Sequence, residues 1–208
     1  MGAGAPAAHN RLVLASTSPY RHRLLIDAGI DHVVVAPSFD ERGLDDELAT
    51  LGEDGLALAL ARGKARSVGS QEGAWILAAD QIAVLDGPVG SEMLTKPGTI
   101  ERAVAQLARM AGREHRLVNG IVLMHPETGS DLSAVDVHVV RMHEYDERAA
   151  RAYVERHRPL DSVGAYRIED DDGLIASIEG GDPSGVIGLS IPAVSELLDR
   201  AGISLGRG

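Results

Sequence analysis

The chain has 208 residues, of which 44% are hydrophobic and none is cysteine, and its formal net charge at pH 7 is -11. A chain of this size and hydrophobicity can bury a core, which argues against disorder of the whole chain, and the lack of cysteine excludes disulfides, a thiol nucleophile and Cys-ligated zinc. The acidic charge argues against nucleic acid as a partner, because that binding rests on clustered Lys and Arg, whereas a small anionic ligand in one local basic pocket remains compatible with it.

The first ten residues, "MGAGAPAAHN", contain neither the basic segment nor the continuous apolar segment of a secretion signal. We expect them to form a flexible tail. No run in the chain approaches the ~18 to 20 apolar residues that cross a bilayer. We therefore expect a cytoplasmic protein without a membrane partner, in which residues 11–208 form a single domain.

In the first part of the chain, predicted strands alternate with predicted helices. Apolar runs predict strands at residues 11–15 and 31–37, with a helix over 19–29 between them. Residues 54–68 are rich in Ala and Leu and predict a second helix. The long apolar stretch 74–87 predicts a strand, or a hairpin that ends in an Asp-Gly turn.

The middle of the chain predicts two helices separated by a pair of strands. Residues 98–112 have the pattern of a helix, with Thr99 as its N-cap. Residues 115–125 and 133–143 are predicted to pair as strands across a polar turn. Residues 146–157 predict the next helix, which ends before a proline.

The last part predicts a hairpin and a final helix. The hairpin joins residues 164–168 to residues 174–180 around an acidic turn, and the helix covers 192–202, capped by Ser190 or a residue nearby. Early alternation of strands and helices with later hairpins indicates an α/β protein. We expect a mixed, partly antiparallel central sheet flanked by helices.

The two lysines are unusual in this composition. Of the 20 basic residues, 18 are Arg, and Lys64 and Lys96 are the remaining two. One explanation is codon bias with two lysines left by chance. The other is that both positions need a compact, flexible charge, since the planar guanidinium of Arg has a different shape and hydrogen-bonding pattern.

The segment "LASTSPYRHRLL", residues 14–25, reads as a strand, a Ser/Thr turn and the start of a helix. Such a turn brings together backbone N–H groups, the hydroxyls of Ser16 and Ser18 and the positive end of a helix, which is a suitable site for a phosphate group. The alternative is an ordinary serine N-cap with solvated Arg21 and Arg23. Neither a Walker loop nor a Rossmann glycine motif occurs in the chain.

Asp80 is the most notable carboxylate, because it lies within the apolar run "WILAADQIAVL", where an unpaired charge would be costly. It could ligate a metal, pair with a cation or accept a proton from water, or it could be a structural residue that caps a turn. Asp40 and Glu41 form a second acidic pair in a loop, where acids are usually solvated. The histidines lack the spacing of a metal site, and no Ser-His-Asp pattern or G-x-S-x-G elbow occurs.

Seven short motifs follow one another along the chain: "LASTSPYRHRLL", "PSFDE", "ARGKA", "AADQIAVLDG", "LTKP", "AGREHRLVNG" and "DPSGVIGL". In their order and approximate spacing they resemble the Maf family of nucleoside triphosphate pyrophosphatases, over roughly residues 11–203. The resemblance implies an α/β architecture with two lobes around a cleft, often dimeric, so that a homodimer is expected. It also implies hydrolysis of a nucleoside triphosphate to the monophosphate and pyrophosphate, with a divalent cation (Mg²⁺, Mn²⁺ or Co²⁺).

The resemblance also assigns roles to individual residues. Asp80 matches the acid usually taken as the general base and, with Glu41, is an expected metal ligand. The positions that match the phosphate-binding residues of the family are Ser16, Ser18, Arg21, Lys64 and Lys96.

Within the family, the sequence looks like the subgroup that acts on 7-methyl-GTP. The residues that carry this specificity assignment are Tyr20, Gln81 and Glu169, which differ from the residues typical of the dTTP/UTP subgroup. Tyr20 could stack on a purine, and Glu169 could accept hydrogen bonds from a guanine edge. Two alternatives stay open: a dTTP/UTP pyrophosphatase, and a nucleotide-binding regulator of cell division without catalysis.

Overall fold

The computed structural model describes residues 11–44, 47–88, 90–170 and 173–203. The predicted flexible tail, residues 1–10, lies outside these described residues. Among the helices of the described ranges, none is long and apolar enough to cross a membrane.

In the described residues, seven strands form one mixed sheet with the order β2-β1-β3-β5-β6-β7, and β4 pairs with β3. Their bounds are β1 Arg11–Ala15, β2 Val33–Val35, β3 Ala74–Gly87, β4 Gly90–Leu94, β5 Glu114–His125, β6 Ser130–Met142 and β7 Ile175–Gly180. β1 runs parallel to β2 and β3, and the other pairs are antiparallel. The predicted mixed, partly antiparallel α/β fold is therefore confirmed.

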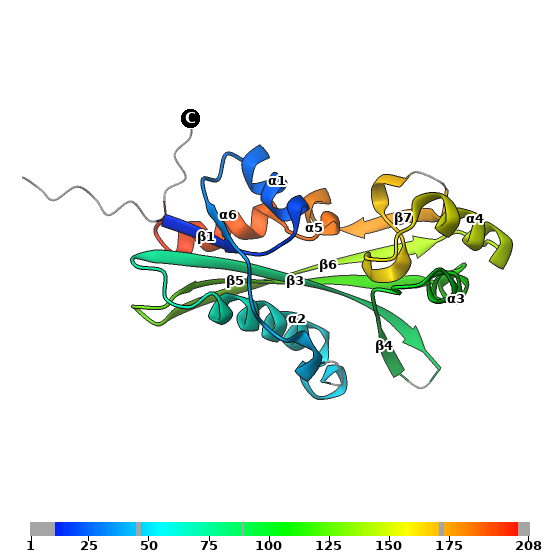
Figure 1. The fold of residues 1–208 in the computed structure, drawn as a ribbon, viewed down its shortest axis with the longest axis horizontal. Helices are drawn as coiled ribbons and strands as arrows, with labels where there is room; N and C mark the ends of the chain where they lie inside the picture. Colours follow the sequence, from blue (N-terminus) through cyan, green and yellow to red (C-terminus); the bar gives the residue numbers. More distant parts are fainter. Residues whose placement is uncertain (1–10, 45–46, 89, 171–172, 204–208) are drawn as a thin grey trace, which may run out of the picture.

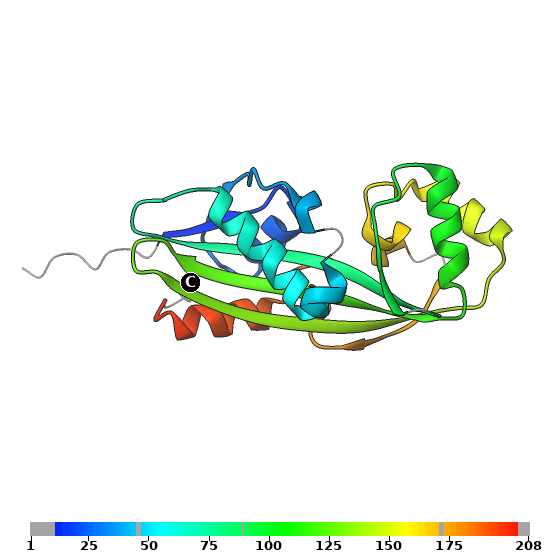
Figure 2. The ribbon, with the colours of Figure 1, turned by 90° about the horizontal axis from the view of Figure 1, so that it is seen from below.

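Helices cover both faces of this sheet (Figure 1). Their bounds are α1 Pro19–Asp27, α2 Leu48–Ser67, α3 Ile100–Met110, α4 Glu147–His157, α5 Pro183–Ile187 and α6 Ile191–Arg200. Figure 1 shows α2 below the long strands β3 and β5, with α1, α5 and α6 above them. Figure 2 shows α3 and α4 gathered at the opposite end of the same long strands. The long strands thus join two helix-covered ends of the molecule.

Each end has its own hydrophobic cluster, and the long strands contribute to both. Leu107 of α3 and Val154 of α4 pack with Leu117 and Val140 of the sheet at one end. At the other end, the cluster under α1 and α6 contains Leu14, Leu25, Ile121, Leu197 and Leu198. A third cluster lies under α2 and includes Leu56, Leu60, Val84 and Val118. Because β3 is covered on both faces, its sequence is apolar almost without interruption.

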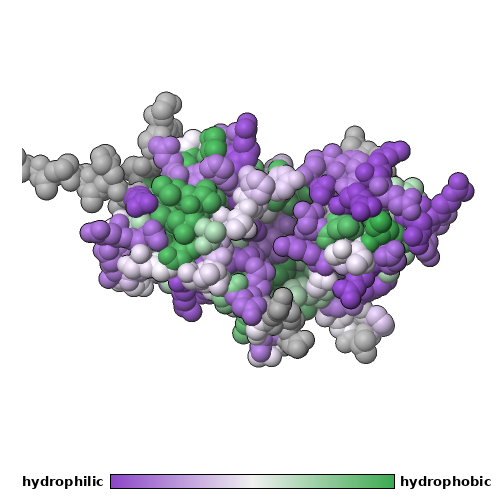
Figure 3. Space-filling model, in the orientation of Figure 1, coloured by the Kyte–Doolittle hydropathy of each residue, from purple (hydrophilic) through white to green (hydrophobic). Residues whose placement is uncertain are grey.

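The surface is mainly hydrophilic in the view of Figure 3, with a hydrophobic area towards each end of the long axis. Large apolar side chains that are exposed include Ile26 of α1 and both Val33 and Val34 of β2. β2 is the last strand of the sheet on its side, so its outer edge has no neighbouring strand among the described residues. This position explains why an apolar strand remains partly exposed.

The predicted hairpin between residues 164–168 and 174–180 is wrong in its first half. Residues Val163–Ala165 and Ile168–Asp170 form short 3-10 turns, and β7 pairs with β6 instead. Gly164 and Ala165 both have positive φ angles, 83° and 61°, which an extended strand does not allow. The other predicted strands and helices lie close to the observed bounds, except that α2 begins earlier, at Leu48, with a kink at Gly52. The sequence analysis gives no strand for β4, Gly90–Leu94.

One short helix, α5, was not predicted. Asp182 caps it by accepting a hydrogen bond from the backbone N–H of Ser184 at 2.9 Å, and Pro183 occupies its first position. The Asp-Pro-Ser sequence is a recognisable helix start. Ser190 precedes α6 in the N-cap position without a side-chain capping bond.

Candidate active site

A cleft with a volume of about 530 Å³ is lined by all ten residues that the sequence analysis assigns to substrate, metal or catalysis. Eight of them come from the β1–α1 segment, the 3-10 turn Glu41–Leu44, α2 and β3: Ser16, Ser18, Tyr20, Arg21, Glu41, Lys64, Asp80 and Gln81. Lys96 and Glu169 line it from the other end of the molecule. The first and last of these residues, Ser16 and Glu169, are separated by about three quarters of the chain length. The tertiary fold therefore brings them together.

The cleft lies at a gap along one edge of β3. β1 pairs with β3 only as far as Leu77, and β4 pairs with the same edge only from Ala83 onward. Asp80 and Gln81 therefore lie where neither strand covers the edge of β3. Since successive strand residues point to opposite faces, the two side chains reach the cleft from opposite sides of the sheet.

The segments that follow β1 and β4 also place residues beside this gap. β1 ends at Ala15, so that Ser16 begins the turn into α1 beside it. β4 ends at Leu94, opposite Ala83, so that Lys96 follows two residues later. The gap explains why these distant parts of the sequence meet.

The turn between β1 and α1 contains the serine N-cap that one of the two explanations expects. Ser18 is the N-cap of α1 and accepts a hydrogen bond from the Arg21 backbone N–H at 3.4 Å. The buried Ser16 hydroxyl accepts one from the Ser18 backbone N–H at 3.1 Å. A hydroxyl that accepts a hydrogen bond can still donate its own proton, so capping does not prevent these serines from contacting an anion.

The two arginines of this segment differ in environment. Arg21 donates from Nε to the backbone oxygen of Gly188 at 2.9 Å and lines the cleft. Burial lowers the pKa of its guanidinium, and the charges of Asp80 and Glu41 act in the opposite direction. Arg23 is exposed and pairs with Asp27 one helical turn later. Arg21 is thus the arginine that the fold directs towards the cleft.

Lys64 joins the two carboxylates of the site. Its Nζ donates to Asp80 Oδ1 and lies 2.9 Å from Glu41 Oε1. The side chains of Lys64 and Asp80 are 12% and 11% exposed, whereas that of Glu41 is 50% exposed. The charge of Asp80 within an apolar strand is therefore compensated by a cation.

Two glycines allow α2 to lie this close to its neighbours. Gly120 of β5 is paired with Asp80, and a Cβ at Gly120 would lie 2.3 Å from the backbone carbon of Ala57 in α2. Gly63 precedes Lys64, and a Cβ there would lie 2.4 Å from the ring of Phe39. The absence of side chains at these positions places Lys64 against β3 and the Phe39 segment against α2.

The residues assigned to base recognition lie around the same cleft. Tyr20 is 50% exposed at the start of α1, and Glu169 lies in the 3-10 turn Ile168–Asp170. Gln81 donates from Nε2 to the backbone oxygens of Gly185 and Val186 at 3.1 and 3.2 Å. The amide nitrogen of Gln81 is therefore bound to α5, which leaves its carbonyl oxygen as the group available to a ligand.

The sequence analysis missed Arg167 and Asp161 as cleft residues. Arg167 donates to Asp161 Oδ1 at 3.1 Å and to the Ser162 hydroxyl at 3.2 Å. The hydrogen bond from Arg167 holds the pKa of Asp161 below its usual range. The incorrect hairpin includes Arg167 in a strand, whereas the residue lies between two 3-10 turns and lines the cleft with Glu169. Arg167 is the fourth basic residue of the cleft, after Arg21, Lys64 and Lys96, and the acids Glu41, Asp80, Asp161 and Glu169 line the same cleft.

Two histidines of the sheet, His115 and His138, are buried. His115 of β5 forms a hydrogen bond with the Tyr166 hydroxyl at 2.7 Å, and burial lowers its pKa to about 4. His138 of β6 donates to Asp136 at 2.7 Å. Neither histidine lines the cleft, although Tyr166 does.

The carboxylates of Asp80 and Glu41 fit a divalent cation that is also coordinated by phosphate oxygens of a substrate. The described residues contain no group of three His, Asp, Glu or Cys side chains arranged for a metal. Mg²⁺ commonly uses one or two protein carboxylates and completes its coordination with water and phosphate oxygens. Asp80 and Glu41 supply such a pair, since Lys64 contacts one oxygen of each.

The chain is similar to a known protein family and to several named relatives. The family described as Maf-like protein matches residues 11–201. A protein of Nitrosococcus oceani named 7-methyl-GTP pyrophosphatase is 35% identical over 193 residues, which cover 92% of this chain and 93% of the relative. Proteins with the same name from Xanthomonas campestris pv. campestris and Vibrio cholerae serotype O1 are 36% and 32% identical, and each alignment covers 94% of this chain. The alignments cover 98% and 97% of those relatives. From the fold, the motifs and these matches, we conclude that the chain belongs to the Maf-like protein family.

Proposed function

We propose that this protein is a nucleoside triphosphate pyrophosphatase that hydrolyses 7-methyl-GTP, or a related modified purine triphosphate, to the monophosphate and pyrophosphate. The observation that carries the proposal is the convergence of Asp80, Lys64 and Glu41 with the predicted phosphate-binding residues in one cleft. The names of the relatives support the choice of substrate.

In the proposed reaction, the phosphate chain lies among the cations and hydroxyls of the cleft. Arg21, Lys64 and Lys96 offset its charge, and Ser16 and Ser18 donate hydrogen bonds to it. These contacts favour departure of pyrophosphate, because negative charge accumulates on the leaving group as the bond to the α-phosphorus breaks.

Asp80 is the proposed general base. Its Oδ1 is held by Lys64, so its second oxygen can accept a proton from the attacking water. Asp80 and Glu41 would hold the divalent cation, Mg²⁺, Mn²⁺ or Co²⁺, which when bound supplies charge neutralisation for the phosphates. In this scheme Lys64 orients the base and also contacts the substrate.

The base of the nucleotide is proposed to bind between Tyr20 and Glu169. A 7-methylguanine base is cationic, and such a ring stacks favourably on the face of tyrosine. Glu169 would accept hydrogen bonds from N1–H and the N2 amino group, which pyrimidines do not present. Gln81 would offer its carbonyl oxygen, since its amide nitrogen is already bound to α5.

A pyrophosphate-release screen with 7-methyl-GTP, GTP, dTTP and UTP in the presence of Mg²⁺, Mn²⁺ or Co²⁺ tests the proposal. We expect the highest kcat/KM with 7-methyl-GTP. A preference for dTTP and UTP would instead identify the pyrimidine-type enzyme. Tight nucleotide binding without pyrophosphate release would identify a regulator that does not catalyse.

The assembly and location of the protein follow from the same proposal. We propose a single domain over residues 11–208 that acts in the cytoplasm, where free nucleoside triphosphates are used, and that needs neither nucleic acid nor a membrane as a partner. We also propose that it forms a homodimer. Light scattering of the purified protein tests the homodimer, and a monomer mass over the whole concentration range would contradict it.

A further inference from the structure

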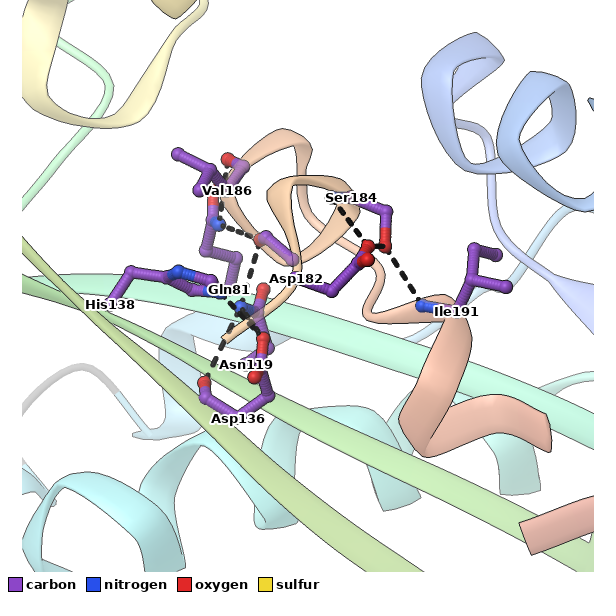
Figure 4. A network of polar contacts seen from close by, with 9 residues as sticks. Gln81, Asn119, Asp136, His138, Asp182, Ser184, Val186 and Ile191 are labelled. Atoms are coloured by element: carbon purple, nitrogen blue, oxygen red, sulfur yellow. Dashed lines mark hydrogen bonds and ion pairs between the residues drawn. The ribbon is translucent and has the colours of Figure 1, made fainter. Parts of the chain in front are cut away.

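A row of polar side chains crosses the three long strands beneath α5 (Figure 4). Gln81 of β3 is paired with Asn119 of β5, which is paired with Asp136 of β6, so all three side chains share one face of the sheet. His138 follows two residues later on the same face. Asn119 and His138 are 0% and 1% exposed. Of these four residues Gln81 lines the cleft, while the other three lie behind it.

These side chains hold the backbone of α5. Asn119 donates from Nδ2 to the backbone oxygen of Gly185 at 2.9 Å, and Gln81 donates to the same oxygen at 3.1 Å. Asp136 Oδ2 accepts a hydrogen bond from His138 Nε2 at 2.7 Å and a longer one, at 3.5 Å, from Asn119 Nδ2. The carboxylate of Asp136 therefore orients both buried donors.

The backbone of α5 also rests directly on this pair. A Cβ at Gly185 would lie 2.0 Å from Asp136 Oδ2 and 2.3 Å from His138 Nε2. A Cβ at Gly181 would lie 2.6 Å from Asp136 Oδ1. The segment can approach the sheet this closely only because both positions are glycine, so Asp136 and His138 form the surface on which α5 sits.

The other end of α5 contacts the cleft. Gly188 follows α5, and its backbone oxygen accepts the hydrogen bond from Arg21 Nε at 2.9 Å. Val186 and Ile187 of α5 line the cleft. Any shift of α5 on the sheet would therefore move the hydrogen-bond acceptors of both Gln81 and Arg21.

We propose that Asn119, Asp136 and His138 are positioning residues, which hold α5 on the sheet so that its carbonyl groups fix Gln81 and Arg21 in the orientation that binds substrate. The effect on substrate rests on the proposed pyrophosphatase function, whereas the effect on α5 does not depend on it. Since Arg21 and Gln81 contact bound nucleotide in this scheme, loss of their orientation raises KM more than it lowers kcat.

The test compares Asn119→Ala and His138→Ala with the conservative variant His138→Gln, in which an amide N–H can still donate to Asp136. His125→Ala is the matched control, because His125 lies at the end of β5 and packs on Trp75 away from the cleft. Amide hydrogen exchange of residues 183–190 measures how stably α5 is attached to the sheet. KM and kcat for pyrophosphate release from 7-methyl-GTP measure the effect of this attachment on the cleft.

We expect about tenfold faster exchange in residues 183–190 and about tenfold higher KM in both alanine variants, in line with the loss of a buried hydrogen bond. His138→Gln should return both values towards wild type, and His125→Ala should change neither. Unchanged exchange in the alanine variants, or faster exchange with unchanged KM, would overturn the inference. Failure of the proposed function is a separate result, seen as no pyrophosphate release by the wild-type protein.

Discussion

Lys64 of α2 donates a hydrogen bond to Asp80 of β3, and both side chains are almost completely shielded from water. Removing one partner of a buried ion pair leaves the other charge uncompensated, which typically costs about 3 to 5 kcal/mol. Changes that preserve the shape of either side chain are therefore the most informative probes of their chemistry.

Asp80→Asn should lower kcat for pyrophosphate release by about 10² to 10⁴-fold, because an amide cannot act as a general base. The amide is close in size to the carboxylate, its oxygen can still accept from Lys64, and Lys64 keeps its ion pair with Glu41. The thermal midpoint should therefore change little. The matched control is Asp27→Asn, at an exposed position on α1. Full activity of Asp80→Asn would rule out the general-base role.

Lys64→Met should lower kcat/KM by about 10 to 100-fold, the range expected for loss of a hydrogen bond between charged groups. Lys64→Arg should also be impaired, because the planar guanidinium has a different shape from the ammonium that contacts both Glu41 and Asp80. Arg66→Met, on the exposed side of the same helix, serves as the control. Wild-type kinetics in Lys64→Arg would show that a positive charge alone is sufficient there.

Gly120→Ala should destabilise the protein by about 1 to 3 kcal/mol, since the new methyl group would overlap the backbone of Ala57 and force α2 away from the sheet. The same shift should separate Lys64 from Asp80 and lower kcat. Urea unfolding measures the change in the free energy of unfolding. Gly43→Ala is the control, because a Cβ there would meet no atom within 4 Å. Equal stability of the two variants would contradict the predicted contact.

His115 should make folding stability depend on pH below neutrality. Burial lowers its pKa in the folded state to about 4, from 6.5, so between these values the unfolded chain binds the proton and the folded protein does not. Stability from this group is therefore complete above pH 6.5 and is lost as the pH falls towards 4, by roughly 1 to 3 kcal/mol. Urea unfolding at pH 5 and pH 7 should show a smaller difference in His115→Gln than in wild type. An identical difference in both proteins would mean that other groups cause the dependence.

Glu169→Gln should reduce kcat/KM for 7-methyl-GTP relative to dTTP and UTP by roughly tenfold, because an amide presents one acceptor oxygen where the carboxylate presents two. The measurement is the ratio of kcat/KM for 7-methyl-GTP to kcat/KM for dTTP or UTP, because this ratio does not depend on the fraction of enzyme that is active. Glu179→Gln, at an exposed position on β7, is the control. An unchanged ratio would place guanine recognition elsewhere in the cleft.

Local sequence patterns were sufficient to predict most individual elements. The Thr99 cap of α3, the paired strands β5 and β6, and the apolar run of β3 are each encoded within a few neighbouring residues. The segment around Gly164 could not be predicted in this way, because the positive φ angle of Ala165 is uncommon for that residue type and Tyr166 is held by a hydrogen bond to His115, 51 positions earlier in the chain. That error also concealed the contribution of Arg167 to the cleft.

By itself, the sequence determined the mixed α/β class, the unusual status of Asp80 and the two lysines, and the resemblance that named the ten site residues. Only the tertiary structure decided how these residues meet. β1 and β4 stop short of each other along one edge of β3, which opens a gap at Asp80 and Gln81. Gly120 lets α2 bring Lys64 to that gap, and the buried row behind it holds α5 against Arg21. Strand register and close backbone approach depend on pairs of residues far apart in the chain, which local patterns do not specify.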